Sequence, residues 1–154
     1  MDNHSISSQL KIEHGNLNAY STGLLQGKAY RALNNSLNKV LYTVDLTVPE
    51  WKLLGQLHDH GIMKLAQIAD RLDVEPPLVT ALIDRLEKKG FVSRDYHPQD
   101  KRAKIISITP KGVKTVKYIE PEVKKIMRKL LNGVSHQDLI VYIKILETIV
   151  NNAS

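Results

Sequence analysis

The sequence predicts a mainly helical protein that carries one small β-hairpin. Apolar residues recur with helical spacing in two short neighbouring segments, 65–72 and 79–86. Two segments typical of short strands follow, at 91–95 and 104–108. Residues 97–100 between them, with the sequence His-Pro-Gln-Asp, favour a turn. Longer segments with helical spacing flank this region on both sides and complete the predicted α+β fold.

Length and composition limit the classes of protein to consider. The chain has 154 residues, the length of one domain, with 42% hydrophobic and 25% charged residues. It contains no cysteine, which excludes disulfides, thiolate metal sites, thiol nucleophiles and thiol-based redox sensing. No apolar run approaches the ~20 residues that span a bilayer, and the polar N-terminus lacks the apolar core of a signal peptide. We therefore expect a soluble cytoplasmic protein without membrane contact.

The charge of the chain is positive and unevenly distributed. The formal net charge of +6 and the isoelectric point near 9.5 favour an acidic partner, of which nucleic acid is the commonest. Basic residues concentrate in the segment 85–117, where only Glu87, Asp95 and Asp100 oppose them. The positive field therefore belongs to one segment, which contains the predicted hairpin.

Two helices are expected before the short pair. The first runs from about residue 16 to residue 44, after a flexible N-terminal arm at residues 1–15. The second begins at Thr47, whose hydroxyl can cap free backbone N–H groups, and Glu50 completes a capping box three residues later. This second helix is expected to end near Gly61.

The two short amphipathic helices come next. Residues 73–75 between them are enough only for a tight turn. Pro76 and Pro77 suit the first turn of the second short helix, where a missing N–H is not needed. Gly90 is expected to end that helix, directly after two lysines whose cations suit the negative end of the helix dipole.

Two helices are expected after the hairpin. The first opens at Thr109-Pro110 and runs to about Leu131, with Pro121 interrupting and bending it. Residues 135–138 cap a last helix, which is apolar on most sides. A surface helix of one small domain needs only an apolar stripe, so this helix is expected to pack against a second copy of the chain. The alternative is a central helix of a monomeric core. The expected dimerisation residues are Leu139, Ile140, Ile143, Leu146, Ile149 and Val150.

A helix, a short turn, a second helix and a basic hairpin follow one another in the order of a winged helix-turn-helix. In that arrangement the second helix has one face for the core and another that can enter a DNA major groove. The hairpin would place its cations beside it, where phosphates or a minor groove lie. The candidate DNA-binding residues are Pro77, Leu78, Thr80, Ala81, Arg85, Arg94, Lys101, Arg102 and Lys104.

Each of these assignments has a plainer alternative. The hairpin tip could be a solvated turn, and the outer face of the second helix could be ordinary exposed surface. Arg85 and Arg94 could be partners in structural ion pairs and not phosphate ligands. The winged helix-turn-helix is expected at residues 46–109, and residues 16–45 and 110–154 form the helical dimerisation region of the same structural unit.

Several segments resemble the MarR/SlyA family of transcriptional regulators. They are Leu46-Thr47, the run Leu-Ala-Gln-Ile-Ala at 65–69, the run from Asp84 to Arg94, and Asp-Lys-Arg-Ala-Lys at 100–104 leading to Gly112. The resemblance implies that the helix at 76–89 reads bases. It also implies that the hairpin tip reaches the adjacent minor groove through Arg102, oriented by Asp100.

The chain departs from the family pattern in its base-reading helix. Many relatives carry a polar or arginine residue where this chain has Leu78 and Ala81. These side chains cannot make bidentate hydrogen bonds to guanine. Methyl contacts to thymine, Thr80 and DNA shape are then expected to carry more of the specificity.

The resemblance also implies a pocket for a small phenolic or aromatic acid between the second helix, the first helix and the DNA-binding region. Trp51 and His58 share a face of the second helix, and Arg31 could supply a cation for a carboxylate. Packing of Trp51 in the core or an interface is the stronger alternative. His58 and His60 are only two residues apart and diverge on a helix, so no metal or other cofactor is expected.

The sequence thus predicts a homodimeric, ligand-responsive transcription factor, a repressor that binds a near-palindromic double-stranded DNA site. Effector binding would change the spacing of the two base-reading helices. When bound to DNA the protein would associate with the bacterial nucleoid. The rival class is a protein-interaction module or a small enzyme. No catalytic motif supports an enzyme, and an interaction module would not need the basic hairpin.

Overall fold

The computed structural model describes residues 19–97 and 100–153, with side chains described for residues 22–96 and 104–153. The helices are α1 (Ala19–Leu41), α2 (Val48–His60), α3 (Leu65–Leu72), α4 (Pro76–Lys88), α5 (Pro110–Leu130) and α6 (His136–Ala153), with a short 3-10 turn η2 (Tyr42–Val44) after α1. The strands are β1 (Met63–Lys64), β2 (Val92–His97) and β3 (Asp100–Ile108). The predicted mainly helical fold with a β-hairpin is confirmed.

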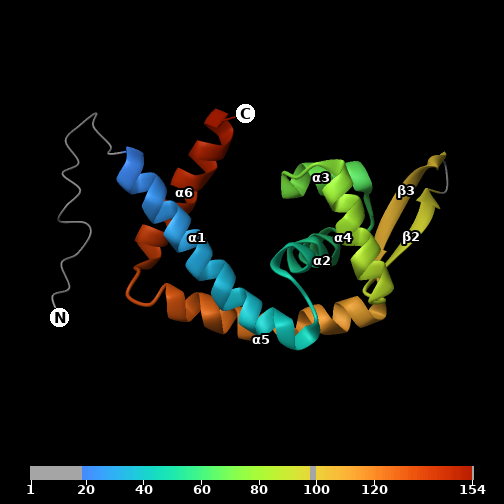
Figure 1. Ribbon diagram of the computed structural model, residues 1–154, viewed down its shortest axis with the longest axis horizontal. Helices are drawn as coiled ribbons and strands as arrows, with labels where there is room; N and C mark the ends of the chain where they lie inside the picture. Colours follow the sequence, from blue (N-terminus) through green and yellow to red (C-terminus); the bar gives the residue numbers. More distant parts are fainter. Residues whose placement is uncertain (1–18, 98–99, 154) are drawn as a thin grey trace.

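The elements form two regions (Figure 1). The first holds α2, α3, α4 and the β2–β3 hairpin, which projects from one end of the molecule. The second holds α1 and α6, which lie toward the opposite end, and α5, which runs along the bottom of the view from the base of the hairpin to that end. Helix α1 crosses α5, and the two pack together where they cross. The hairpin and α6 therefore stand far apart on the molecule.

The sheet has three antiparallel strands in the order β1-β3-β2. Val92 pairs with Ile108 and Tyr96 pairs with Lys104, with an irregularity between Tyr96 and His97. Both strands of the hairpin are longer than expected, and β1 was not predicted at all. Two residues are too few to show an alternating pattern, and β1 exists because Met63 pairs with Ile106 and buries its side chain.

The helix boundaries follow the expected capping chemistry. The Thr47 hydroxyl accepts a hydrogen bond from the Glu50 N–H, and a Glu50 carboxylate oxygen accepts one from the Thr47 N–H at 2.8 Å. This confirms the predicted capping box. Gly90 ends α4 with a φ of 74°, a left-handed conformation that favours glycine. Ser135 caps α6 by accepting from the Asp138 N–H at 3.0 Å.

The expectation that Pro121 interrupts α5 is wrong. The helix is continuous from Pro110 to Leu130, with Pro121 inside it. Proline removes one N–H that would bond to the carbonyl of Lys117, one turn earlier. Both residues are exposed, so water can bond to the carbonyl that the proline leaves free. Surface exposure is therefore what allows the helix to continue.

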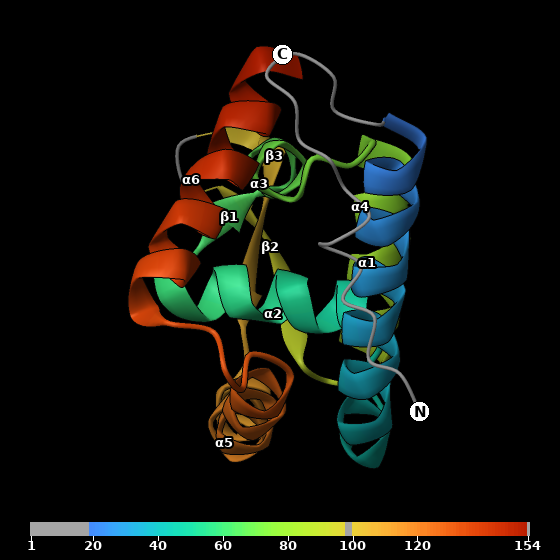
Figure 2. The ribbon, with the colours of Figure 1, turned by 90° about the vertical axis from the view of Figure 1, so that its left-hand side faces the viewer.

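One hydrophobic core joins the two regions. Leu54 and Leu57 of α2 pack with Ile83 and Leu86 of α4, and α5 contributes Ile119. Helix α6 contributes no buried residue. Figure 2 shows α6 standing apart from α1 at the end of the molecule that faces the viewer. No helix in the described part of the chain has the length and apolar character needed to cross a membrane.

Candidate nucleic-acid interface

Helix α4 has one buried face and one exposed face. Val79, Leu82, Ile83 and Leu86 are buried because they recur on the side that packs against α2 and α3. The opposite side exposes Pro77, Leu78, Asp84, Arg85 and Lys88, while Thr80 and Ala81 are half-buried between the two faces. The sequence-predicted residues of this helix therefore share one surface, which faces away from the core.

The β2–β3 hairpin lies beside this surface. Strand β2 begins four residues after the end of α4 and packs against it. Lys104 is exposed on β3, opposite the exposed Tyr96 on β2. The backbone of Asp100, Lys101 and Arg102 lies in β3, whereas their side chains lie outside the described residues.

Arg94 reaches from β2 to two carboxylates on α4. Its guanidinium hydrogen-bonds to Asp84, and its Nε lies 3.1 Å from a Glu87 carboxylate oxygen. The Arg94 side chain is 21% exposed, so these ion pairs are partly shielded from water. Arg94 thus offsets part of the negative charge that Asp84 and Glu87 would otherwise present beside the hairpin. Sequence inspection did not pair it with Asp84, because the partners lie on different elements.

Arg85 is also part of an ion-pair cluster. Its Nε lies 3.2 Å from a carboxylate oxygen of Glu50, which is fully buried at the start of α2. Lys89 lies 3.1 Å from the other Glu50 oxygen. The alternative of structural ion pairs therefore describes what both Arg85 and Arg94 do in the free chain. Their role toward DNA stays a prediction.

Glu50 is ionised in this cluster. Burial raises the pKa of its carboxyl group, but hydrogen bonds from Thr47 and Lys89 lower it by more, so the pKa lies below its ordinary value. Sequence reasoning found Glu50 as a capping residue and missed that it also joins α2 to α4. The cap is a local pattern, whereas the ion pairs span 35 and 39 residues.

The C-terminal end of α4 is held by three further hydrogen bonds. The Lys89 ammonium donates to the backbone oxygen of Asp45 at 2.7 Å, between α1 and α2. The Lys111 ammonium donates to the Lys89 carbonyl at 2.6 Å, and the Thr109 hydroxyl donates to the Gly90 carbonyl at 2.7 Å. The second and third bonds satisfy the carbonyls of Lys89 and Gly90, which directly follow the last turn of α4. The exposed surface of α4 is therefore fixed relative to both α1 and α5.

The three residues expected to bind an effector differ in their exposure and in the groups that they contact. Arg31 is exposed on α1 and its guanidinium lies over Gly27, one turn earlier on the same helix. Trp51 is half-buried and packs against the core. His58 contacts Asp59 through its Nδ1 at 3.0 Å. Within the described residues, no three histidine or acidic side chains gather in a way that could hold a metal.

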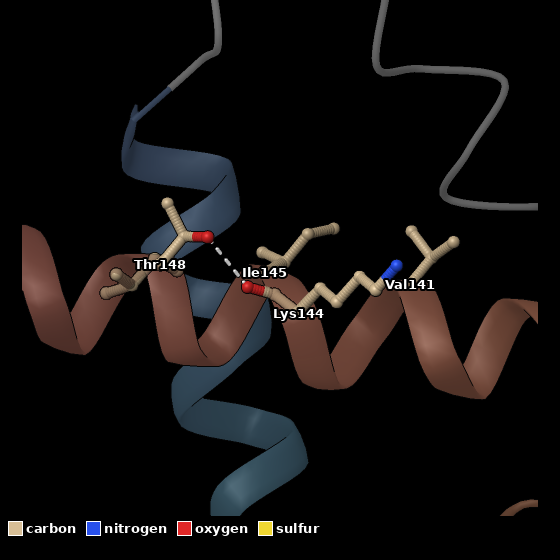
Figure 3. A pocket seen from close by; sticks show the side chains of 5 residues that line it. Val141, Lys144, Ile145 and Thr148 are labelled. Carbon is tan, nitrogen blue, oxygen red and sulfur yellow. Dashed lines mark hydrogen bonds between the residues drawn. The ribbon is translucent and has the colours of Figure 1, made fainter.

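The expected dimerisation residues are on a helix that the chain itself leaves uncovered. Ile143, Leu146, Ile149 and Val150 are 46%, 39%, 48% and 64% exposed, while Leu139 and Ile140 are half-buried. A hollow of about 260 Å³ lies on α6 itself, lined by Val141, Lys144, Ile145, Thr148 and Ile149. Figure 3 shows four of these side chains on one side of α6, with Lys144 extending along the helix toward Val141.

A two-helix unit whose second helix projects beside a β-hairpin defines a winged helix-turn-helix protein. Residues 46–104 match the family model described as "MarR family". This match covers 59 of the 154 residues, and the curated relatives to which the chain is similar are named HTH-type transcriptional regulators or repressors.

Three Bacillus subtilis relatives illustrate the sequence match. The chain is 35% identical to the HTH-type regulator YfiV over 71 residues, which are 46% of this chain and 44% of YfiV. It is 26% identical to the regulator MhqR over 84% of this chain and 90% of MhqR. It is 31% identical to the repressor MdtR over 57% of each chain. The matches to YfiV and MdtR thus span less than two thirds of those proteins.

Solved structures match the fold over most of the chain. A mutant of Escherichia coli MarR in complex with operator DNA has a TM-score of 0.78 at 22% identity, covering 82% of this chain and 91% of that chain. Staphylococcus aureus MepR in complex with DNA has a TM-score of 0.78 at 23% identity, covering 84% and 96%. Bordetella bronchiseptica BpsR has a TM-score of 0.77 at 20% identity, covering 83% and 91%. At these identities the likeness establishes the winged-helix fold.

Proposed function

We propose that the chain is a sequence-specific double-stranded DNA-binding transcriptional repressor that acts in the bacterial cytoplasm. The observation that carries the proposal is the exposed face of α4 beside a basic hairpin, both fixed to one core. A protruding helix fits the width of a major groove, and the neighbouring cations attract phosphates. Two matched structures are DNA complexes, and one matched relative, MdtR, is named a repressor.

The hairpin tip supplies the minor-groove contact in this proposal. Lys101 and Arg102 stand near the start of β3, and Lys104 follows on the same strand. Asp100 would orient the Arg102 guanidinium by a charge-assisted hydrogen bond. An arginine in a narrow minor groove gains from the concentrated negative potential there.

The protein is proposed to bind as a homodimer through α6. An 18-residue helix without a single buried residue leaves its apolar side chains in water unless a second copy covers them. Leu24, Leu25 and Tyr30 of α1 are also exposed. Helix α1 begins at the same end of the molecule as α6 (Figure 1). Two copies joined at this end would carry two α4 helices, which calls for a near-palindromic DNA site.

Ligand responsiveness is the remaining part of the proposal. The effector would be a small aromatic or phenolic acid bound near Trp51 and His58, with Arg31 turning to pair with its carboxylate. BpsR, whose DNA binding is regulated by 6-hydroxynicotinic acid, shares the fold. Its test is a titration of that acid, which is expected to weaken DNA binding by the wild type and less by Arg31→Ala. Equal binding with and without the acid would count against this effector.

DNA selection followed by a salt series tests the proposal as a whole. Bound duplexes are selected from genomic fragments, and the affinity for the best one is compared with random duplex of equal length. We expect a specific dissociation constant on the order of 10⁻⁸ M and a steep loss of affinity with salt. Absence of any preferred duplex at every salt concentration would reject sequence-specific binding.

A paired substitution tests the hairpin. Arg102→Ala should weaken specific binding by about tenfold or more, because an arginine in a narrow minor groove is lost. Lys39→Ala, which removes an exposed cation in the last turn of α1, is the matched control. Equal affinities for the two variants would remove the hairpin tip from the DNA interface.

A further inference from the structure

The polar groups on the exposed face of α4 are largely engaged within the chain. The Thr80 hydroxyl donates to the Pro76 carbonyl at 3.1 Å, one turn earlier on the same helix. Asp84 pairs with Arg94, and Arg85 pairs with the buried Glu50. A base edge approaching this face would therefore have to compete with contacts that the folded protein already makes.

The first two turns of α4 offer a different kind of surface. Leu78 is 48% exposed, Pro77 is exposed and Ala81 is half-buried, and none of the three carries a polar side-chain atom. These positions lie at the N-terminal part of the helix, the part that contacts base edges in helix-turn-helix complexes. The base-reading surface is thus apolar where it would approach the bases most closely.

One chemical group in the major groove matches such a surface. Guanine presents two acceptors, cytosine a donor, and adenine one acceptor and one donor, whereas thymine adds an apolar C5-methyl group. Recognition of guanine calls for arginine or lysine, and recognition of adenine for asparagine or glutamine. Residues 77–81 contain none of these four residue types.

We propose that α4 selects its DNA site by contacting thymine C5-methyl groups through Leu78 and Ala81. The inference rests on the proposed DNA-binding function and names the group that the helix reads. Affinity and selectivity then have different sources. Exposed cations such as Lys88 and Lys104 bind phosphates of any sequence, while the apolar first turns discriminate between bases.

The test replaces individual thymines of the selected duplex by deoxyuridine. This change removes the methyl group and leaves every hydrogen-bonding atom of the base pair in place. Each contacted thymine should lose about fourfold in affinity, the effect of removing one buried methyl-sized group from an apolar contact. Sensitive positions should fall in both half-sites, at symmetry-related places.

The variant Leu78→Ala tests whether Leu78 is the residue that contacts the thymine methyl group. Leu78 is exposed, so the variant should fold, and circular dichroism verifies that it does. Deoxyuridine at the position that Leu78 contacts should no longer weaken binding by this variant. An unchanged loss would mean that the methyl group acts through DNA stiffness and not through Leu78. Ile62→Ala, a change at another exposed aliphatic residue, should keep the full deoxyuridine effect.

The outcomes separate this inference from the proposed function. If no duplex is preferred over random DNA, the proposed function fails and deoxyuridine is not needed to show it. If one duplex is preferred and deoxyuridine has no effect at any position, the protein is a specific DNA binder and the thymine-methyl inference is overturned. Loss of the deoxyuridine effect in Ile62→Ala as well would overturn the assignment to Leu78.

Discussion

Arg94 leads to a prediction about DNA binding that does not require it to touch DNA. Its pairs with Asp84 and Glu87 place one positive charge against two negative ones on the side of α4 that faces the hairpin, which lowers the negative charge there. We predict that Arg94→Ala weakens DNA binding by about tenfold, because two uncovered carboxylates would then lie near phosphates. The affinity of the variant for the selected duplex measures this.

Replacing Arg94 in a protein that lacks the two carboxylates distinguishes its effect on their charge from a direct contact with a DNA phosphate. In a protein that already carries Asp84→Asn and Glu87→Gln, Arg94→Ala should have little further effect, since no carboxylate remains to be neutralised. An arginine that contacts a phosphate directly would lose at least as much affinity in that background. An equal or larger effect there would assign Arg94 to the phosphate contacts.

Glu50 leads to a prediction about stability and pH. Its pKa is lowered in the folded chain, so its ionised form stabilises the fold above the ordinary glutamate pKa of 4.5, and that stabilisation is lost as pH falls through the lower folded value. Glu50→Gln should therefore cost about 2 kcal/mol at pH 7, because Lys89 and Arg85 lose their buried counter-charge. Urea unfolding at pH 7 measures the difference.

Wild type and Glu50→Gln should also differ in how their stability depends on pH. The stability difference between wild type and Glu50→Gln should shrink below about pH 4.5, where the wild-type carboxyl group begins to lose its advantage. Glu75→Gln, at an exposed glutamate that precedes α4, serves as the control and should change stability little. A difference that is constant between pH 7 and pH 3 would contradict an electrostatic role for Glu50.

At the scale of the elements, the sequence predicted the helices better than the contacts between them. The boundaries of α4 follow from Pro76 at its start and Gly90 after its end, because these residues act on their own backbone. The boundary of β1 depends on Met63 meeting Ile106, a partner 43 residues away. The same difference between local and long-range features holds in the candidate site. The exposed residues of α4 could be predicted from the helical spacing, whereas the ion pairs of Glu50 and Arg94 could not, because their partners lie on other elements.

The junction between β3 and α5 depends on a close approach at Gly112. A Cβ atom there would lie 2.3 Å from the Phe91 carbonyl oxygen and 2.6 Å from Cγ1 of Ile108, too close for any side chain. We predict that Gly112→Ala destabilises the protein by about 2 kcal/mol, because backbone must move to accommodate the methyl group. Thermal unfolding checks this.

A second glycine provides the control for that prediction. Gly55 lies inside α2, and apart from the adjoining backbone of that helix no atom lies within 4 Å of a Cβ placed on it, so Gly55→Ala should leave the melting temperature unchanged or raise it. Since α5 follows this junction directly, Gly112→Ala should also loosen the Thr109 hydrogen bonds that hold the end of α4. A melting temperature equal to that of wild type would show that the junction is not tightly packed.

At the scale of the whole molecule, the two opposite ends of the fold have different surfaces. The end with α4 and the hairpin exposes the cations Lys88 and Lys104, whereas α6 exposes apolar side chains along its length. The hairpin and α6 stand at opposite ends of the molecule (Figure 1). The core of the chain is complete without α6. The helix therefore has no evident part in folding one copy, which is why an interface is the expected role.

Leu146 gives the sharpest test of that role. We predict that Leu146→Asp converts the proposed homodimer into a monomer, because a carboxylate would be buried at the proposed interface without a partner. Light scattering after size exclusion measures the molecular mass, with the wild type expected at twice the 17.4 kDa of one chain. Since Leu146 contributes nothing to the core, circular dichroism should show that the variant keeps its helices.

The monomeric variant should also lose most of its DNA affinity. One α4 contacts only one half-site of the DNA. The binding free energy from the second half-site is then lost, and the affinity should fall by about a hundredfold or more. Ile62→Asp, at an aliphatic residue that is 64% exposed between α2 and β1, is the matched control and should stay dimeric. A Leu146→Asp protein that remains a dimer would place the interface elsewhere, with the exposed part of α1 around Leu24 as the next surface to test.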